Sequence, residues 1–393
     1  LEPEQLAFVV AIGLDAGPNG KLITTFQIAN PEVGTSLLGT TTQEEQASEI
    51  VSIASDELFS VKNMANAFVS RRITFSHLRI IIVSEQLARK EDFAELMFSI
   101  IREKEMRRSV YLMVCKERAE TFIRKNQPIL ETRPHKYYQL MIARAAMTGL
   151  IPKSDLMQYY RIAEADESLY LAMYASLEQQ APKEGSVKEN EDTHTAGGIT
   201  ARGDLSAQLT GSAVFKKGRM IGTLTGEETR LSLLLSKTAR PLNVVVTMQD
   251  PLQKNRRIPI KISGKTKPKL TMNLKSDRPT IRVEMTLDLE IITIPSLIDY
   301  SGDLKKQALL IEALETEFEA QIARLIGKTQ KELKGEPFEW GVLARRHFLT
   351  LAEYQAFNWM ERYPGMKVDC RVTVNLTEFG LQLRTPNIGN LED

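Results

Sequence analysis

The chain has 393 residues, with 51 Lys and Arg against 50 Asp and Glu, and a formal net charge of +1. This length predicts two or three domains, with cores that need no metal or disulfide support. The charge balance argues against a dedicated nucleic-acid binder, which usually has a basic excess, and against recruitment to a membrane by charge alone. No run approaches the ~18 apolar residues of a membrane span. No signal peptide is present; because the chain begins at Leu1 without Met, we expect that a preceding signal or anchor has been removed.

The first third of the sequence predicts a layered α/β domain over residues 1–125. Residues 6–30 predict a hairpin around the turn sequence GPNG. Residues 40–59 predict a helix, with a threonine cap at Thr41 or Thr42. The apolar residues at helical spacing are Ala47, Ile50, Ile53 or Ala54, and Leu58. A strand over 78–83, a helix that begins after Ser84, an amphipathic helix over 91–107 and a buried strand over 109–116 complete this domain.

Residues 126–237 predict a small middle domain of helices and a β-hairpin. One helix begins at Pro134 and ends near Gly149, a second covers 153–166, and a strand begins near 170. Residues 181–204 contain almost no large apolar side chains and predict a mobile loop. The RGD tripeptide at its end, residues 202–204, is a chance match.

The stretch GSAVFKKGRMIGTLTGEET, residues 211–229, raises the question of a phosphate-binding or acid-pair site. Its alternation instead predicts a hairpin, with strands over 209–215 and 219–224 and a turn that needs the positive φ of Gly218. Gly222 indicates a bulge or a close backbone approach. Thr225 and Glu228 have the spacing of a capping box, with Glu227 also in the first turn of the helix that follows. Each polar residue thus has a structural role, with a contact surface as the alternative.

Residues 238–393 predict an antiparallel sheet packed against a long helix. Four segments with period-2 alternation predict strands, and in the last of them, residues 280–294, Ile281 and Val283 begin the apolar face. Residues 303–334 predict a helix of ~30 residues with one apolar face, and a second helical region, 341–362, precedes a closing strand over 366–376. The fold class is therefore α+β, in a chain of three domains: 1–125, 126–237 and 238–393.

The sequence contains no catalytic, cofactor-binding or metal-ligating motif that we can support. The serine-hydrolase elbow, the zinc-protease helix and the phosphate-binding loop are absent. The four histidines, His77, His135, His194 and His347, fall in separate regions and are interpreted as surface or capping residues. The basic segments RKEDF, REKEMRR and KNRR are interleaved with acids or lie at turns, which indicates solvated faces.

The two cysteines, Cys115 and Cys370, lie in apolar, strand-like runs and are interpreted as buried free thiols. Their spacing fits neither a metal site nor a redox motif. A disulfide between them remains an alternative at this point.

Four ordered segments resemble the C subunit of bacterial spore-germination nutrient receptors, the Ger(x)C lipoprotein family. The first is LAFVVAIGLD followed by FQIANP, and the second is FSHLRIIIVSEQLAR, residues 75–89. The third is GSAVFKKGRMIGTLTGEET, and the fourth is NWMERYPGMKVDCRVTV, residues 358–374. Two features depart from the family: the lipidated cysteine is not in the sequence, and its FGFG-like segment is matched only approximately, by Phe338, Trp340 and Gly341.

The resemblance implies a non-enzymatic lipoprotein subunit of a germinant receptor, with a signal and a lipid such as palmitate. It implies tethering to the outer face of the spore inner membrane, beside the integral-membrane A and B subunits, and a role in nutrient-triggered germination through assembly with them. It implies no cofactor, metal or nucleic acid. A soluble extracytoplasmic protein that binds the nutrient germinant directly is the alternative; it would need a deep cleft with convergent polar groups. An enzyme ranks third, because no nucleophile, base or metal set is visible.

Overall fold

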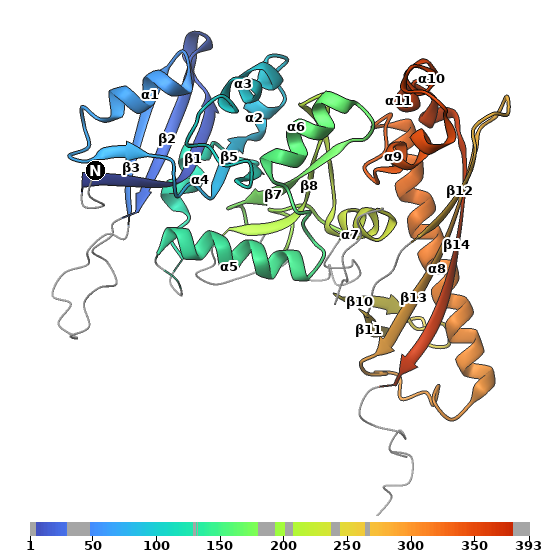
Figure 1. The fold of residues 1–393 in the computed structure, drawn as a ribbon. Helices are drawn as coiled ribbons and strands as arrows, with labels where there is room; N and C mark the ends of the chain where they lie inside the picture. Colours follow the sequence, from blue (N-terminus) through green and yellow to red (C-terminus); the bar gives the residue numbers. More distant parts are fainter. Residues whose placement is uncertain are drawn as a thin grey trace, which may run out of the picture. The chain divides into compact units, whose positions relative to one another are not determined.

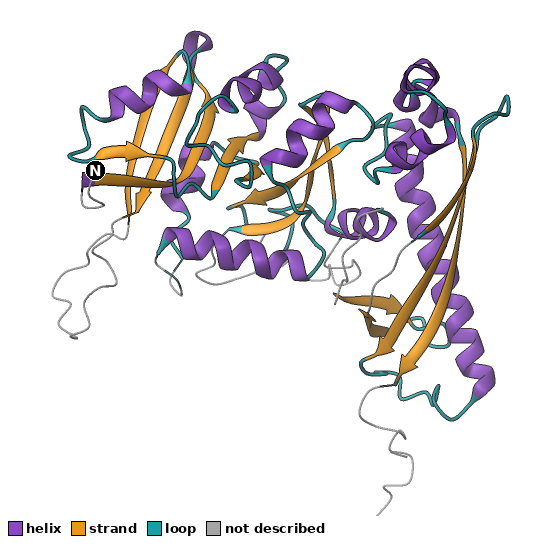
Figure 2. Cartoon of the chain, in the orientation of Figure 1, coloured by secondary structure: helices purple, strands orange, loops and turns teal. Residues whose placement is uncertain are grey.

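The computed structural model describes residues 5–29, 48–128, 131, 133–179, 193–200, 207–236, 244–263 and 268–379. The chain divides into two compact units. The N-terminal unit extends to Thr229, without the short piece Met147–Gly149, and the C-terminal unit comprises that piece and the chain from Arg230 onward. Both units combine helices with strands (Figures 1 and 2), so the α+β class predicted from the sequence is confirmed.

The N-terminal unit is built on one sheet, whose described strands follow the order β3-β2-β1-β5-β6-β7-β8-β9, with β4 beside β1. The central strands β1, β5, β6 and β7 are parallel, and antiparallel pairs continue the sheet on both flanks. The strands are β1 (Leu6–Ala16), β2 (Leu22–Ala29), β3 (Ser48–Ser55), β4 (Arg72–Thr74), β5 (Ile80–Ser84), β6 (Tyr111–Cys115), β7 (Tyr170–Ser176), β8 (Gln208–Lys216) and β9 (Arg219–Leu224).

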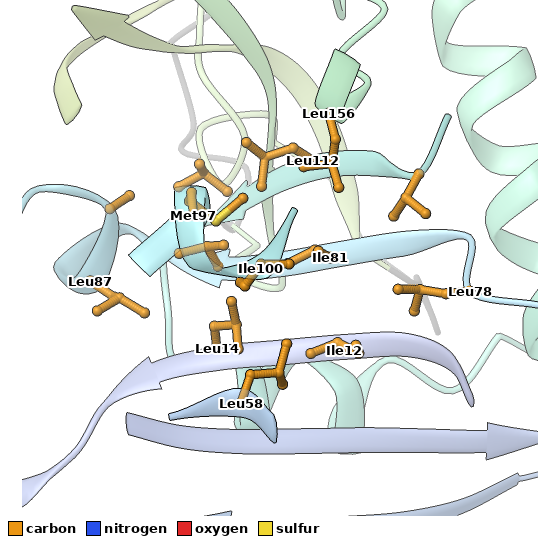
Figure 3. Packing of buried hydrophobic residues seen from close by; sticks show 14 of the residues in the cluster. Ile12, Leu14, Leu58, Leu78, Ile81, Leu87, Met97, Ile100, Leu112 and Leu156 are labelled. Carbon is orange, nitrogen blue, oxygen red and sulfur yellow. The ribbon is translucent and has the colours of Figure 1, made fainter. Parts of the chain in front are cut away.

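Helices cover both faces of this sheet, because its central strands are apolar on both sides. In β5, Ile81 and Val83 belong to one buried cluster, whereas Ile80 and Ile82 belong to another on the opposite face. Figure 3 shows the first cluster, in which the labelled residues are Ile12, Leu14, Leu58, Leu78, Ile81, Leu87, Met97, Ile100, Leu112 and Leu156. The helices are α1 (Leu58–Ala65), α2 (Glu85–Ala88), α3 (Phe93–Ile100), α4 (Ala119–Lys125), α5 (Pro134–Met147) and α6 (Leu156–Ala165).

One predicted helix is wrong. Residues 48–55 form β3, which pairs antiparallel with β2 along its length, and the helix α1 begins only at Leu58. The helical spacing of Ile50 and Leu58 is coincidental: Ile50, Val51 and Ile53 are β-branched residues that suit a strand, and the edge of β2 selects that conformation. The expected caps Thr41 and Thr42, together with Ala47, lie outside the described residues.

The other predicted elements of this unit are present, with shorter bounds in places, and β4 and α4 are elements that the sequence pattern did not predict. The helix expected over 91–107 ends at Ile100, after which the chain turns toward β6. Because β6 and β7 pair, one sheet joins the predicted N-terminal and middle segments across residue 125. The division at 125 and 237 stays a prediction. Most of the predicted mobile loop, including the RGD tripeptide, lies outside the described residues.

The C-terminal unit contains a second sheet with the order β10-β11-β13-β12, and β14 pairs with β13. Its strands are β10 (Val244–Gln249), β11 (Arg257–Ser263), β12 (Lys269–Asn273), β13 (Thr280–Ile291) and β14 (Lys367–Glu378). The long helix α8 (Leu304–Lys331) buries the predicted apolar face that includes Leu310, Phe318 and Ile322. The shorter helices are α9 (Trp340–Ala344), α10 (Leu351–Phe357) and α11 (Trp359–Arg362), and α7 (Gly226–Leu235) spans the boundary between the two units.

The closing strand β14 differs from the expected antiparallel arrangement. β14 runs parallel to β13, whereas the other pairs in this sheet are antiparallel. The connection through α8 and the short helices returns the chain to the end of the sheet where β13 began, which a short antiparallel turn cannot do. Glu319 and Glu315 of α8 accept the N–H groups of Val372 and Val374 at 2.9 Å each, so α8 covers part of this strand edge.

No helix in the described parts of the chain has the length and apolarity to cross a membrane.

Candidate functional site

The carboxyl ends of β1, β5, β6 and β7 form the edge where open α/β sheets commonly bind ligands. Asp15, at the end of β1, is buried, and its carboxylate accepts the N–H groups of Ala119 at 2.8 Å and Glu120 at 2.9 Å. These donors begin helix α4, where the helix dipole favours a negative charge. Asp15 therefore fixes α4 on the sheet.

The other acids at this edge are also bonded to the fold. Glu117 accepts the Ser176 hydroxyl at 3.1 Å and the backbone N–H of Leu177. Glu85 accepts the hydroxyl of Tyr174 and pairs with Arg89. Because these carboxylates hold neighbouring strands and helices, the edge provides structural bonds, and a ligand would have to displace them.

The cysteines are free, as expected, and the disulfide alternative is not realised, but Cys370 is half-buried where burial was expected. Cys115, at the end of β6, is fully buried. Burial raises the pKa of its thiol, and the charge of Glu117 raises it further. Burial likewise raises the pKa of Cys370 to about 12. Both thiols therefore stay protonated at neutral pH, which removes the thiolate that a cysteine nucleophile requires.

Two of the four histidines come near each other in the structure, since the charge of His77 is among the causes that lower the pKa of His135. His77 stacks on Phe8, with ring centroids 4.4 Å apart. Burial lowers the pKa of His135, and the positive charges of Arg133 and Arg79 lower it further. Among the described residues, no group of three or more His, Cys, Asp or Glu side chains could hold a metal ion.

The stretch that begins at Gly211 forms the predicted hairpin and capped helix. β8 and β9 pair antiparallel, and the turn residues Lys217 and Gly218 have φ values of 51° and 78°. The Gly218 carbonyl accepts the hydroxyl of Tyr159 at 2.7 Å, and a Cβ at Gly218 would lie 2.9 Å from the Cβ of Ala94. The absent side chain thus lets the turn pack closely on helices α3 and α6.

Two further features of the same stretch are structural. The predicted capping box is present: the Thr225 N–H donates to Glu228 Oε2 at 2.8 Å, and the Glu228 N–H donates to Thr225 Oγ1 at 3.2 Å. Gly211 has a φ of 85°, and a Cβ there would lie 2.4 Å from the Leu224 carbonyl oxygen. The residues of this stretch therefore have structural roles, in the turn, the helix cap and the close packing of the backbone.

The C-terminal unit contains a buried acid that no sequence motif indicated. Glu336 is fully buried and accepts the N–H groups of Phe338 at 2.5 Å and Gly341 at 2.9 Å, and the indole N–H of Trp359 at 3.2 Å. Burial raises its pKa to about 8 against the effect of these donors, and the charge of Glu339 raises it further. The nearby aromatic residues in the sequence were the available signal.

This buried acid, with the aromatic residues around it, forms what we call the Glu336 cluster: Glu336, Phe338, Trp340, Trp359 and Tyr363. The rings of Phe338 and Trp340 lie 4.5 Å apart, and those of Trp359 and Tyr363 lie 6.2 Å apart. The Trp340 indole N–H donates to the Leu235 carbonyl at 3.0 Å. The cluster thereby connects the loop before α9 to α11 and to the end of α7, and it includes the approximate counterpart of the FGFG-like segment.

Comparison with known proteins adds family evidence to this geometry. The family model described as "Spore germination protein N-terminal domain" matches residues 1–176, and the one described as "Spore germination B3/ GerAC like, C-terminal" matches residues 210–380. Together these matches cover most of the chain. The chain belongs to the GerAC-like spore germination family. The resemblance noted in the sequence is therefore confirmed.

Two relatives of this GerAC-like chain extend along almost its whole length. Spore germination protein KC of Bacillus subtilis (strain 168) is 23% identical over 401 residues, covering 97% of this chain and 91% of that protein. The structure titled "Crystal Structure of the GerBC protein" aligns with a TM-score of 0.55 at 15% identity, and the alignment covers 95% of this chain and 99% of that chain. At this identity the structural likeness shows the fold alone. The chain is thus a spore germination receptor C subunit by family, in a family that is not known for enzymes.

Proposed function

We propose that this chain is a non-enzymatic lipoprotein subunit of a spore germinant receptor. It is tethered to the outer face of the spore inner membrane and acts in nutrient-triggered germination by assembling with integral-membrane A and B subunits. The observation that carries the proposal is the match of both GerAC-like family models, in chain order, over residues 1–176 and 210–380.

The chemistry of the described residues supports an assembly role. The carboxylates at the carboxyl edge of the sheet bond to helix starts and strands, and the two thiols are buried or half-buried with raised pKa values. Tight bonds of this kind give a rigid scaffold, and a general base or nucleophile would instead need to face a substrate.

The test is a deletion of the encoding gene in its own spore-forming host, complemented by the wild-type gene or by a form whose lipidation cysteine is replaced. We expect nutrient-triggered release of dipicolinic acid to fall in the deletion strain for one nutrient class and to return with the wild-type gene. Affinity capture of the complementing protein from spore membranes should recover the two integral-membrane subunits. Normal germination of the deletion strain on every nutrient would contradict the proposal, as would saturable heat on titrating a nutrient into the purified chain, with no subunit captured.

A further inference from the structure

The charged segment REKEMRR separates its acids from its bases when the chain folds. The side chains of Glu103 and Glu105 are 15% and 33% exposed, and both lie near Lys62 of α1, at 3.9 Å and 3.1 Å. Glu105 also accepts the Phe75 N–H at 2.8 Å and the Thr74 hydroxyl at 3.0 Å. The two acids are therefore bonded to Lys62 and to the backbone before β5, and the four bases of the segment are left as its main charges facing solvent.

The exposed cations gather at the amino ends of the parallel strands. They share exposure to solvent and form no ion pair within the described part of the chain: Arg72, Arg79, Arg102, Lys104, Arg107 and Arg108. Backbone bonds place them along one edge. Arg72 pairs with Leu6 at the start of β1, and the Arg79 carbonyl accepts the N–H of Tyr111 at 2.9 Å, which joins the starts of β5 and β6. We call these six residues the amino-edge cations.

Large apolar side chains project beside the amino-edge cations. Met64, at the end of α1, is 46% exposed, and Phe68, in the turn before β4, is 72% exposed. The Lys62 contacts with Glu103 and Glu105 bring this end of α1 against the cationic segment. On the other side, Met157 is 59% exposed, and its N–H donates to the Arg108 carbonyl at 2.9 Å. Unpaired cations are thus flanked by exposed apolar groups.

We propose that this edge of the N-terminal unit rests on the surface of a bilayer that contains anionic lipids. Arginines attract the headgroup phosphates, and Phe68, Met64 and Met157 insert at the boundary between headgroups and acyl chains. A single-stranded nucleic acid would need a row of stacking aromatic residues, and among the described residues beside these cations Phe68 is the one large aromatic side chain that is mostly exposed. The net charge of +1 does not reveal this local excess of positive charge, because most of the compensating acids lie elsewhere in the chain.

The position of β1 agrees with this orientation. Leu6 pairs with Arg72, so β1 begins at the same edge as the cations. An N-terminal lipid, which is part of the proposed function and on which this step rests, would enter at this edge and hold it toward the membrane. The cationic and apolar groups then fix how the unit lies on the bilayer, which a single flexible anchor does not do.

The experiment measures binding of the 393-residue chain, without any lipid, to vesicles by co-flotation. We compare phosphatidylcholine vesicles with vesicles that also contain phosphatidylglycerol. Binding should require the anionic lipid and weaken as salt rises, because mobile ions screen these charges. Each arginine at an anionic surface contributes about fivefold, so the Arg72→Gln, Arg107→Gln, Arg108→Gln variant should bind roughly 100-fold more weakly.

Matched controls keep the test specific. Arg256, Arg278 and Arg371 of the C-terminal unit are also exposed and form no ion pair among the described residues, and their triple replacement by Gln should leave vesicle binding unchanged. Phe68→Ser should weaken binding while preserving its dependence on anionic lipid. Unfolding curves of each variant show whether it is folded. If the triple variant of Arg72, Arg107 and Arg108 is unfolded, the comparison of Phe68→Ser with the wild-type chain tests the proposal.

Three results would overturn the proposal: equal binding to the two kinds of vesicle, equal loss in the control triple, or no loss on replacing the amino-edge arginines. If the wild-type chain binds neither kind of vesicle and the amino-edge variant loses capture of the membrane subunits, this edge would be assigned to an acidic protein partner. Because the vesicle assay contains no receptor, its failure leaves the germination role standing. A failed germination test with intact vesicle binding would contradict the germination role and leave the membrane contact standing.

Discussion

Two glutamates, Glu228 in the hairpin region and Glu336 in the C-terminal cluster, both accept backbone N–H groups, and they differ in their surroundings. Glu228 is half-buried at the start of α7, where Thr225 returns a hydrogen bond and the helix dipole stabilises the negative charge. Glu336 is fully buried among aromatic rings, and burial raises its pKa to about 8. The same hydrogen-bonding pattern therefore gives a local helix cap in one region and, in the other, a buried anchor whose stabilising effect depends on pH.

The largest expected effect concerns the pH dependence of stability at Glu336. Its folded pKa of about 8 lies above the ordinary value of 4.5, so between these pH values the folded chain holds a proton that the unfolded chain releases. The free energy of unfolding should therefore fall as pH rises through this window, by on the order of 5 kcal/mol at about 1.4 kcal/mol for each pH unit. Urea unfolding at a series of pH values measures this fall.

The Glu336→Gln variant isolates the contribution of this acid. The amide does not titrate in this range. The difference between the wild-type and variant free energies of unfolding should therefore change with pH by the amount that Glu336 contributes. His135 has a lowered pKa and acts in the opposite direction, since its stabilising effect grows as pH rises, but it is common to both proteins and cancels. Parallel curves for the two proteins would show that Glu336 does not titrate in this range.

The next largest effect is expected at Gly211 in the hairpin region. Gly211→Ala combines a φ of 85° with a Cβ placed 2.4 Å from the Leu224 carbonyl oxygen, and should lower the free energy of unfolding by roughly 2–4 kcal/mol. Gly20→Ala is the control, since Gly20 has a φ of 75° and no heavy atom within 4 Å of an added Cβ. It should cost about 1 kcal/mol. Equal losses would mean that the close approach to Leu224 is unimportant.

The smallest effect is expected at the cap of α7. Replacing Glu227 and Glu228 by Lys should lower the free energy of unfolding by about 1–2 kcal/mol, because the cap bond is lost and positive charges oppose the helix dipole. Thr225→Ser keeps a hydroxyl acceptor and should cost far less. Thermal or urea unfolding measures both changes. Full stability of the double Lys variant, with lost capture of the membrane subunits, would identify the stretch as a contact surface.

The hairpin region shows how far local pattern reaches. The turn at Gly218 and the capping box depend on residues a few positions apart, and the structure has both as predicted. The amphipathic face of α8 and the alternating strands of the C-terminal sheet were also predictable, because burial follows periods of 3.6 and 2 residues. Residues 48–55 show where prediction from local pattern fails. Ile50 and Leu58 fit a helical period, but residues 48–55 form a strand because they pair with β2.

By itself, the sequence determined the α+β class, the hairpin with its capped helix and the family, since each depends on local spacing or on ordered motifs. Tertiary structure alone decided that Glu336 loses its contact with water, that β14 runs parallel to β13, and that Glu103 and Glu105 turn inward. These outcomes depend on which distant segments meet. Desolvation, strand direction and the separation of charges are properties of those contacts.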